Sequence, residues 1–69
     1  MAYIEVKKGE IIFTKQTYTE IVELLNSEKQ FICLDEINDE NSFLDDEGNR
    51  CLGFDKIAVN KDNVIKVID

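Results

Sequence analysis

The sequence predicts an α+β fold: a small antiparallel sheet or partly open barrel of about five or six short strands, with one helix packed across it. Apolar and polar residues alternate in short runs along most of the chain, as in half-buried strands. Turn-forming residues separate these runs at close intervals. Only residues 17–26 have the spacing of an amphipathic helix, so a single helix must cover the strands.

Residues 3–14 predict a β-hairpin. Apolar residues alternate with charged ones before the Lys8-Gly9 pair and continue after it. Gly9 tolerates the positive φ that a tight hairpin turn requires. The alternative interpretation is one long strand with a bulge at Gly9.

Residues 17–26 predict the helix. Thr17 and Glu20 have the spacing of a capping box, in which each side chain accepts a hydrogen bond from the other residue's backbone. The expected apolar face is Tyr18, Ile21, Val22, Leu24 and Leu25. A helix of about ten residues is marginal alone, so it must dock on the sheet.

Three further strands are expected in the rest of the chain, together with a second hairpin. Residues 29–37 are apolar on both faces where they begin, which is typical of a central strand. Residues 56–59 and 64–68 predict the last two strands, with a tight turn between them. The turn signal at residues 46–49 predicts the second hairpin, with an acidic tip, and Gly53 would interrupt its return strand as a bulge.

The length and the cysteines limit how this fold is stabilised. The 69 residues form at most one domain, 1–69, and a domain of this size buries only about 60% of its unfolded surface. Cys33 and Cys51 lie in apolar runs, so we expect buried free thiols rather than a disulfide. Without histidine, neither a zinc site nor a Cys–His nucleophile is expected. Association into a homodimer could supply the missing stabilisation.

The negative charge is concentrated in the acidic segment, residues 35–49. This segment holds seven acidic residues and no basic one, whereas the other eight acidic residues are matched by eight Lys and Arg. The formal charge of −7 argues against nucleic-acid binding through phosphate contacts and against binding to anionic membranes. A basic protein surface is the expected complement.

The predicted partner-binding residues lie inside the acidic segment and are Asp39, Glu40, Phe43, Asp45, Asp46 and Glu47. Phe43 and Leu44 could form an apolar centre within a charged rim, the usual arrangement of a protein interface. In the alternative interpretation both side chains point into the core, and the carboxylates only keep the protein soluble. The clustering favours binding, because concentrated charge repels itself and a partner's Lys and Arg would relieve that repulsion.

The acidic segment is less well suited to catalysis or to metal binding. Paired carboxylates such as Asp45-Asp46 can act as general acid and base, but they need a walled pocket that a hairpin tip does not provide. Counting back from Gly48 places Phe43 at the first ligand position of an EF-hand loop, so that motif fails. We therefore expect no enzymatic activity, no cofactor and no dedicated metal site. Weak binding of Ca²⁺ or Mg²⁺ stays open as a third hypothesis.

The order of the helix, Phe31–Leu34 and the strand–turn–strand of residues 56–68 resembles small accessory proteins of Gram-positive bacterial phages, prophages and mobile elements. The resemblance covers the helix and the last fourteen residues, and the acidic segment has no counterpart in it. It implies an accessory gene and a bacterial host. Such small acidic phage proteins are similar in kind to inhibitors of host enzymes or defence complexes, some of which imitate a phosphate backbone. No functional residue carries over.

Two functional hypotheses follow. In the first, the chain is a non-enzymatic protein-binding module whose acidic segment docks on a basic surface of a bacterial protein, with a nucleic-acid-binding enzyme as one candidate. In the second, it is a structural or assembly module that homo-oligomerises through sheet edges, which no proline protects. The sequence shows no signal peptide and no apolar run of about 18 residues, so a cytoplasmic location is expected.

Overall fold

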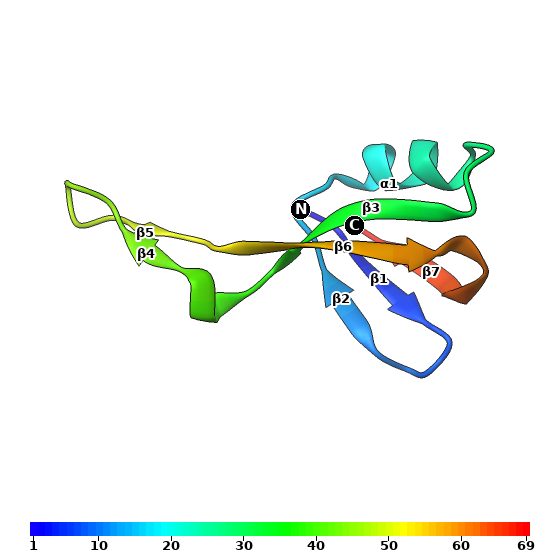
Figure 1. Ribbon diagram of the computed structural model, residues 1–69, viewed down its shortest axis with the longest axis horizontal. Helices are drawn as coiled ribbons and strands as arrows, with labels where there is room; N and C mark the ends of the chain where they lie inside the picture. Colours follow the sequence, from blue (N-terminus) through cyan, green and yellow to red (C-terminus); the bar gives the residue numbers. More distant parts are fainter.

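The computed structural model describes residues 1–69 and has the predicted α+β fold, with one α-helix, two 3₁₀ helices and seven short strands (Figure 1). The elements in chain order are β1 Tyr3–Val6, β2 Ile11–Phe13, α1 Tyr18–Leu25, β3 Phe31–Ile37, η1 Asp39–Asn41, β4 Phe43–Leu44, β5 Arg50–Cys51, β6 Phe54–Asn60, η2 Lys61–Asn63 and β7 Val64–Ile68. The strands form three antiparallel sheets, ordered β2-β1-β7, β3-β6 and β4-β5. No helix is long and apolar enough to cross a membrane.

The three-stranded sheet contains the predicted first hairpin. Tyr3 pairs with Phe13 across β1 and β2, and Gly9 adopts a φ of 80° in the turn between them. The alternative of one long strand bulged at Gly9 is therefore wrong. β7 pairs with the other edge of β1, and the register of this pair shifts between Glu5 and Val6. The central strand of this sheet is β1, near the N-terminus, and its pairing with the C-terminal strand β7 brings the two ends of the chain together.

The strand β3 lies in a two-stranded ribbon with β6, and not at the centre of a sheet as predicted. Phe31 pairs with Asn60 at one end of the ribbon, and Ile37 pairs with Phe54 at the other. The other edge of β3 has only one bridge, to Thr14. A two-stranded ribbon packs one face on the core and leaves the other toward solvent, so its apolar outer residues stay exposed.

The two cysteines are free, but neither is buried, so the expectation of buried thiols is wrong. Cys33 is exposed because it lies on the outer face of the ribbon, opposite the buried side chains of Ile32 and Leu34. Cys51 is half-buried in β5, outside the core. The apolar neighbours along the sequence therefore did not determine the burial of either thiol.

The core lies between the three-stranded sheet, the ribbon and α1. Its buried apolar side chains are Ala2, Ile4, Val6, Ile12, Ile21, Ile32, Leu34 and Val59. Each fully buried Ile or Leu contributes about 1.5–3 kcal/mol from burial. Thr14 is also buried, and its hydroxyl donates a hydrogen bond to the Ala2 carbonyl at 3.0 Å, which satisfies its polar group.

The helix α1 has the predicted capping box. The Glu20 amide donates to Thr17 Oγ1 at 3.2 Å, and the Thr17 amide donates to Glu20 Oε1 at 3.1 Å. α1 packs against β7 and places Ile21 in the core, whereas Tyr18 stays exposed at the edge of the expected apolar face. The Lys61 ammonium donates to the Ser27 carbonyl and so connects η2 to the end of the helix.

Candidate functional site

The acidic arm, residues 38–53, extends beyond the core as a continuation of the β3–β6 ribbon, to the left in Figure 1. It makes the molecule elongated, with dimensions of 41 × 23 × 19 Å. Gly53 is its one buried residue, so the arm has no apolar core of its own. The predicted second hairpin is thus present, as a projection rather than as part of the main sheet.

Hydrogen bonds to one carboxylate hold the base of the arm. Asn38 Nδ2 donates to Asp55 Oδ2 at 2.6 Å, and Asn41 Nδ2 donates to Asp55 Oδ1 at 2.7 Å. Gly53 lies between β5 and β6, where a Cβ atom would overlap the backbone of Asn41. The glycine therefore permits a close approach of two chain segments, and this explains the interruption predicted at this position.

The tip of the arm is organised by Asp45. Its Oδ1 accepts hydrogen bonds from the amides of Glu47 at 2.9 Å and Asn49 at 2.8 Å. Gly48 supplies the positive φ, 82°, that the turn requires. Asp45 is thus the residue that shapes the turn, a role the sequence does not distinguish from that of its acidic neighbours.

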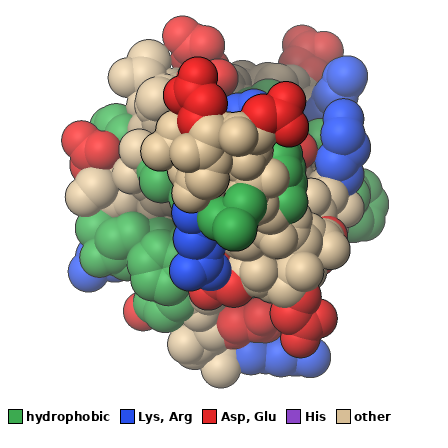
Figure 2. All heavy atoms as spheres, turned by 90° about the vertical axis from the view of Figure 1, so that its left-hand side faces the viewer, with side chains coloured by type: hydrophobic (Ala, Val, Ile, Leu, Met, Phe, Trp, Pro, Cys, Tyr) green, Lys and Arg blue, Asp and Glu red, His purple; other side chains and the backbone are tan.

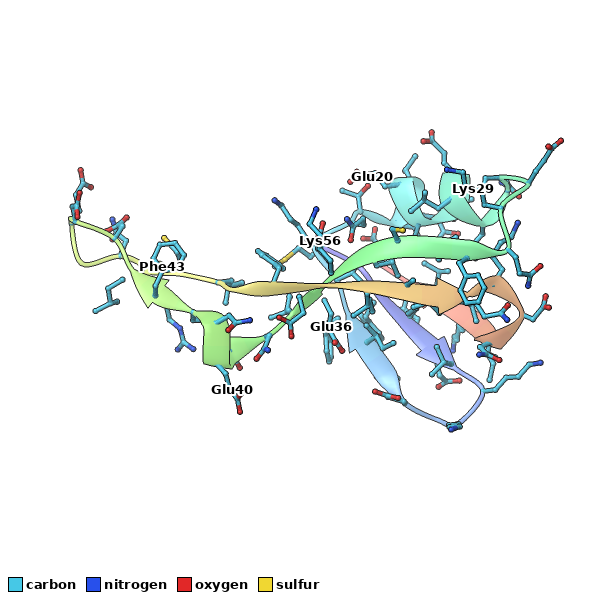
Figure 3. The ribbon with its side chains drawn as sticks, viewed as in Figure 1. Glu20, Lys29, Glu36, Glu40, Phe43 and Lys56 are labelled. Atoms are coloured by element: carbon cyan, nitrogen blue, oxygen red, sulfur yellow. The ribbon has the colours of Figure 1, made fainter.

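All six predicted site residues lie on the arm and are exposed. Asp39 and Glu40 lie on η1, Phe43 lies on β4, and Asp45, Asp46 and Glu47 lie in the turn between β4 and β5. Figure 3 shows Glu40 and Phe43 on the arm, far from Glu20 and Lys29 beside the core. The structure therefore brings these six residues onto one projecting element.

The other two acidic residues of the segment, Asp35 and Glu36, lie on β3 and are half-buried. Asp35 Oδ2 accepts a hydrogen bond from Gln16 Nε2 at 2.9 Å, which connects β3 to the start of the helix. The acidic segment is thus divided between five carboxylates on the arm and two in the ribbon. Only the five on the arm are exposed to solvent.

The apolar side chains of the arm face solvent. Phe43 is 60% exposed and Leu44 is 69% exposed, so the interpretation that both point into the core is wrong. Figure 2 views the molecule from the end that carries the arm and shows hydrophobic side chains at the surface beside acidic ones. Exposed apolar side chains surrounded by charged residues are typical of interaction sites.

Arg50 is a feature of the arm that the sequence analysis missed. It follows the acidic segment by one position, but the hairpin places its guanidinium 3.6 Å from Asp39. Both side chains are exposed, so this ion pair contributes little to stability. Five acidic residues and one basic residue give the arm a formal charge of −4.

A groove of about 560 Å³ lies on the core, between the tip of the β1–β2 hairpin and the β6–η2 corner. Its apolar lining is Val6, Ile12, Phe31, Ala58 and Val59. Lys7 and Lys8 line it as well, beside Glu10. The groove depends on residues brought together by long-range pairing, so no local motif predicts it.

No group of three or more His, Cys, Asp or Glu side chains is arranged to hold a metal ion. Comparison with known proteins finds no match to a protein family, a curated protein or a solved structure. The geometry of the arm and the groove is therefore the basis for a functional interpretation.

Proposed function

We propose that the protein is a non-enzymatic binding module whose acidic arm docks on a basic surface of a bacterial protein. The observation that carries this proposal is the exposure of Phe43 and Leu44 on an arm without a core, among five carboxylates. Burial of each of these side chains against a partner would contribute about 1.5–3 kcal/mol. The carboxylates would form the rim, where charge guides association and orientation.

Hydrogen bonds at the tip and the base of the arm support this role. Asp45 fixes the turn and Asp55 fixes the base, although neither interaction buries apolar surface. A loop that is already ordered loses less conformational entropy when it binds. The arm therefore resembles a preformed ligand more than a flexible acidic tail.

The charge of the arm indicates the partner's chemistry. A surface rich in Lys and Arg would pair with Asp39, Glu40, Asp46 and Glu47, and would leave Phe43 over an apolar site. A nucleic-acid-binding enzyme is one candidate, because its phosphate-binding residues are basic. The resemblance to phage and mobile-element proteins makes a host enzyme in the bacterial cytoplasm the target to test, with inhibition as the expected consequence.

The test is affinity capture from a nuclease-treated bacterial lysate with three baits. The arm variant carries Asp39→Asn, Glu40→Gln, Asp45→Asn, Asp46→Asn and Glu47→Gln. Asparagine at position 45 retains an oxygen that can accept both turn hydrogen bonds, so the arm keeps its shape. The control variant removes five carboxylates elsewhere, with Glu5→Gln, Glu10→Gln, Glu23→Gln, Glu28→Gln and Asp69→Asn.

The proposal expects one basic protein on the wild-type and control baits and none on the arm variant. The purified partner should then bind wild type with an affinity that falls as salt rises, because exposed charge pairs are screened. An affinity unchanged by the five arm substitutions at low salt would refute the proposal.

Self-assembly through sheet edges is the second candidate function. The outer edges of β2 and β7 are unpaired, and so is one edge of β6. Phe13 on β2 is 54% exposed and Ile65 on β7 is 57% exposed, which adds apolar surface beside these edges. This candidate expects an oligomer that forms with rising concentration and that the five arm substitutions leave unchanged.

A further inference from the structure

The groove at the β1–β2 tip is a second surface with binding character. Val6, Ile12 and Val59 line it as buried core residues with 8–9% of their surface exposed. Phe31 stands at its wall with 56% of its surface exposed. A concave apolar surface beside two lysines suits a ligand that combines an apolar side chain with negative charge.

The acidic arm of the same chain has those two properties. It presents Phe43 and Leu44 to solvent, and the carboxylates of Asp46 and Glu47 follow them within a few residues. The arm carries a formal charge of −4, whereas Lys7 and Lys8 outnumber the single acidic residue of the groove, Glu10. The two surfaces are complementary in both hydrophobicity and charge.

The arm does not reach the groove of its own molecule. Figure 1 shows β4 and β5 at one end of the long axis, whereas the β1–β2 turn and the β6–β7 corner lie at the other end. The molecule is 41 Å long in this direction, and hydrogen bonds to Asp55 on β6 hold the base of the arm to the ribbon. A contact between the arm and a groove must therefore join two copies.

We propose that the acidic arm of one copy docks in the groove of a second copy. Phe43 then lies against the apolar lining near Phe31, and Asp46 and Glu47 face Lys7 and Lys8. The contact joins two unlike surfaces, so copies can associate head to tail or as a closed pair with two such contacts. It does not depend on the proposed function, because its occupant is a second copy and the purified chain is sufficient to test it.

Charge exchange between the two surfaces tests the proposal. The groove variant carries Lys7→Glu and Lys8→Glu, and the arm variant carries Asp46→Lys and Glu47→Lys. All four side chains are exposed and make no side-chain hydrogen bond, so both variants should fold. Lys29→Glu with Lys66→Glu is the matched control, because these exposed lysines lie outside the groove. Circular dichroism verifies the fold of every variant.

Sedimentation velocity at low salt measures self-association of each protein over a range of concentrations up to about 1 mM. We expect wild type and the control to associate, and each of the two variants alone to associate at least about tenfold more weakly. An equimolar mixture of the two variants should associate like wild type. In that mixture the native arm meets the native groove, and the reversed arm meets the reversed groove. Phe43→Ala should weaken association by a similar factor, because it removes the apolar anchor.

Three results would overturn the proposal. Wild type could stay monomeric at about 1 mM, which would exclude a contact of useful strength. The groove and arm variants could each associate like wild type, which would assign assembly to the sheet edges instead. Finally, the mixture could fail to recover association although each variant is folded, which would show that the two surfaces are not partners.

Discussion

Single residues decide how the acidic arm is shaped. Asp45 and Asp46 are adjacent and identical in sequence, yet Asp45 accepts two backbone hydrogen bonds and Asp46 accepts none. Asp55 has a comparable role at the base of the arm, where it holds two asparagine side chains. The carboxylates of this chain thus have two distinct roles. Asp45 and Asp55 hold the arm in shape through hydrogen bonds, whereas Asp46 accepts none and carries free charge.

The first prediction concerns Asp45. Asp45→Ala removes the acceptor of the Glu47 and Asn49 amides, so both amides should lose protection against hydrogen exchange. The turn is exposed, and each lost hydrogen bond contributes about 0.5–1.5 kcal/mol to its local stability. Hydrogen exchange measured by NMR gives the rates of both amides. Asp46→Ala is the control and should change neither rate; equal effects of the two substitutions would contradict the assigned role.

At this scale the sequence identifies candidate residues but does not distinguish their roles. All six predicted site residues do lie together on the arm, because they are close in sequence and one hairpin contains them. The burial of Cys33 and Cys51 was predicted incorrectly, because burial depends on which face of a ribbon is covered. That is decided by contacts distant in sequence, such as the bridge from Thr14 to Glu36.

The elements that could be predicted are those with local signals. The capping box of α1 lies within four residues, Gly9 adopts the positive φ expected in its turn, and the predicted turn at residues 46–49 is present with Gly48 at a φ of 82°. The partners of β3 could not be predicted, because strand pairing joins residues far apart in sequence. The β6 strand also begins earlier than expected, at Phe54, because the ribbon continues to the base of the arm.

The second prediction concerns the helix. Thr17→Ala removes the acceptor of the Glu20 amide and should lower the free energy of unfolding by about 1 kcal/mol. For a domain that relies on a small core and one eight-residue helix, this is a substantial fraction of the stability. Urea denaturation followed by circular dichroism measures the change. Thr19→Ala, at an exposed helical position whose side chain makes no hydrogen bond, should change it by less than half as much.

On the scale of the whole molecule, the chain is divided into a core and a projecting acidic arm. The sequence locates the charge, but it does not indicate that five of the seven carboxylates leave the core on a projecting hairpin. The arm projects because the β3–β6 ribbon extends past the rest of the fold. The ribbon does so because β3 and β6 are longer than the other strands. The core groove likewise results from the meeting of the β1–β2 tip with β6 and η2.

The last prediction is that the core folds without the arm. The Asn38 amide donates to the Gly53 carbonyl at 2.9 Å, so these two residues lie opposite each other as at the end of a hairpin. Replacement of residues 39–52 by Asn-Gly should close the ribbon with a two-residue turn. None of the replaced residues is buried, so the core should keep its packing, and the free energy of unfolding should change by less than about 1 kcal/mol.

The same replacement removes the arm's charge of −4, so the formal charge changes from −7 to −3 and the salt dependence of the melting temperature should weaken.

Removal of the arm should also abolish both capture of a basic partner and self-association, whereas the shortened chain should still bind the wild-type arm through its intact groove. Scanning calorimetry at two salt concentrations and sedimentation of the mixture measure these effects. A shortened chain that is unfolded would show that the arm contributes to the core. A folded chain that still associates with itself would assign assembly to the edges of β2, β6 and β7.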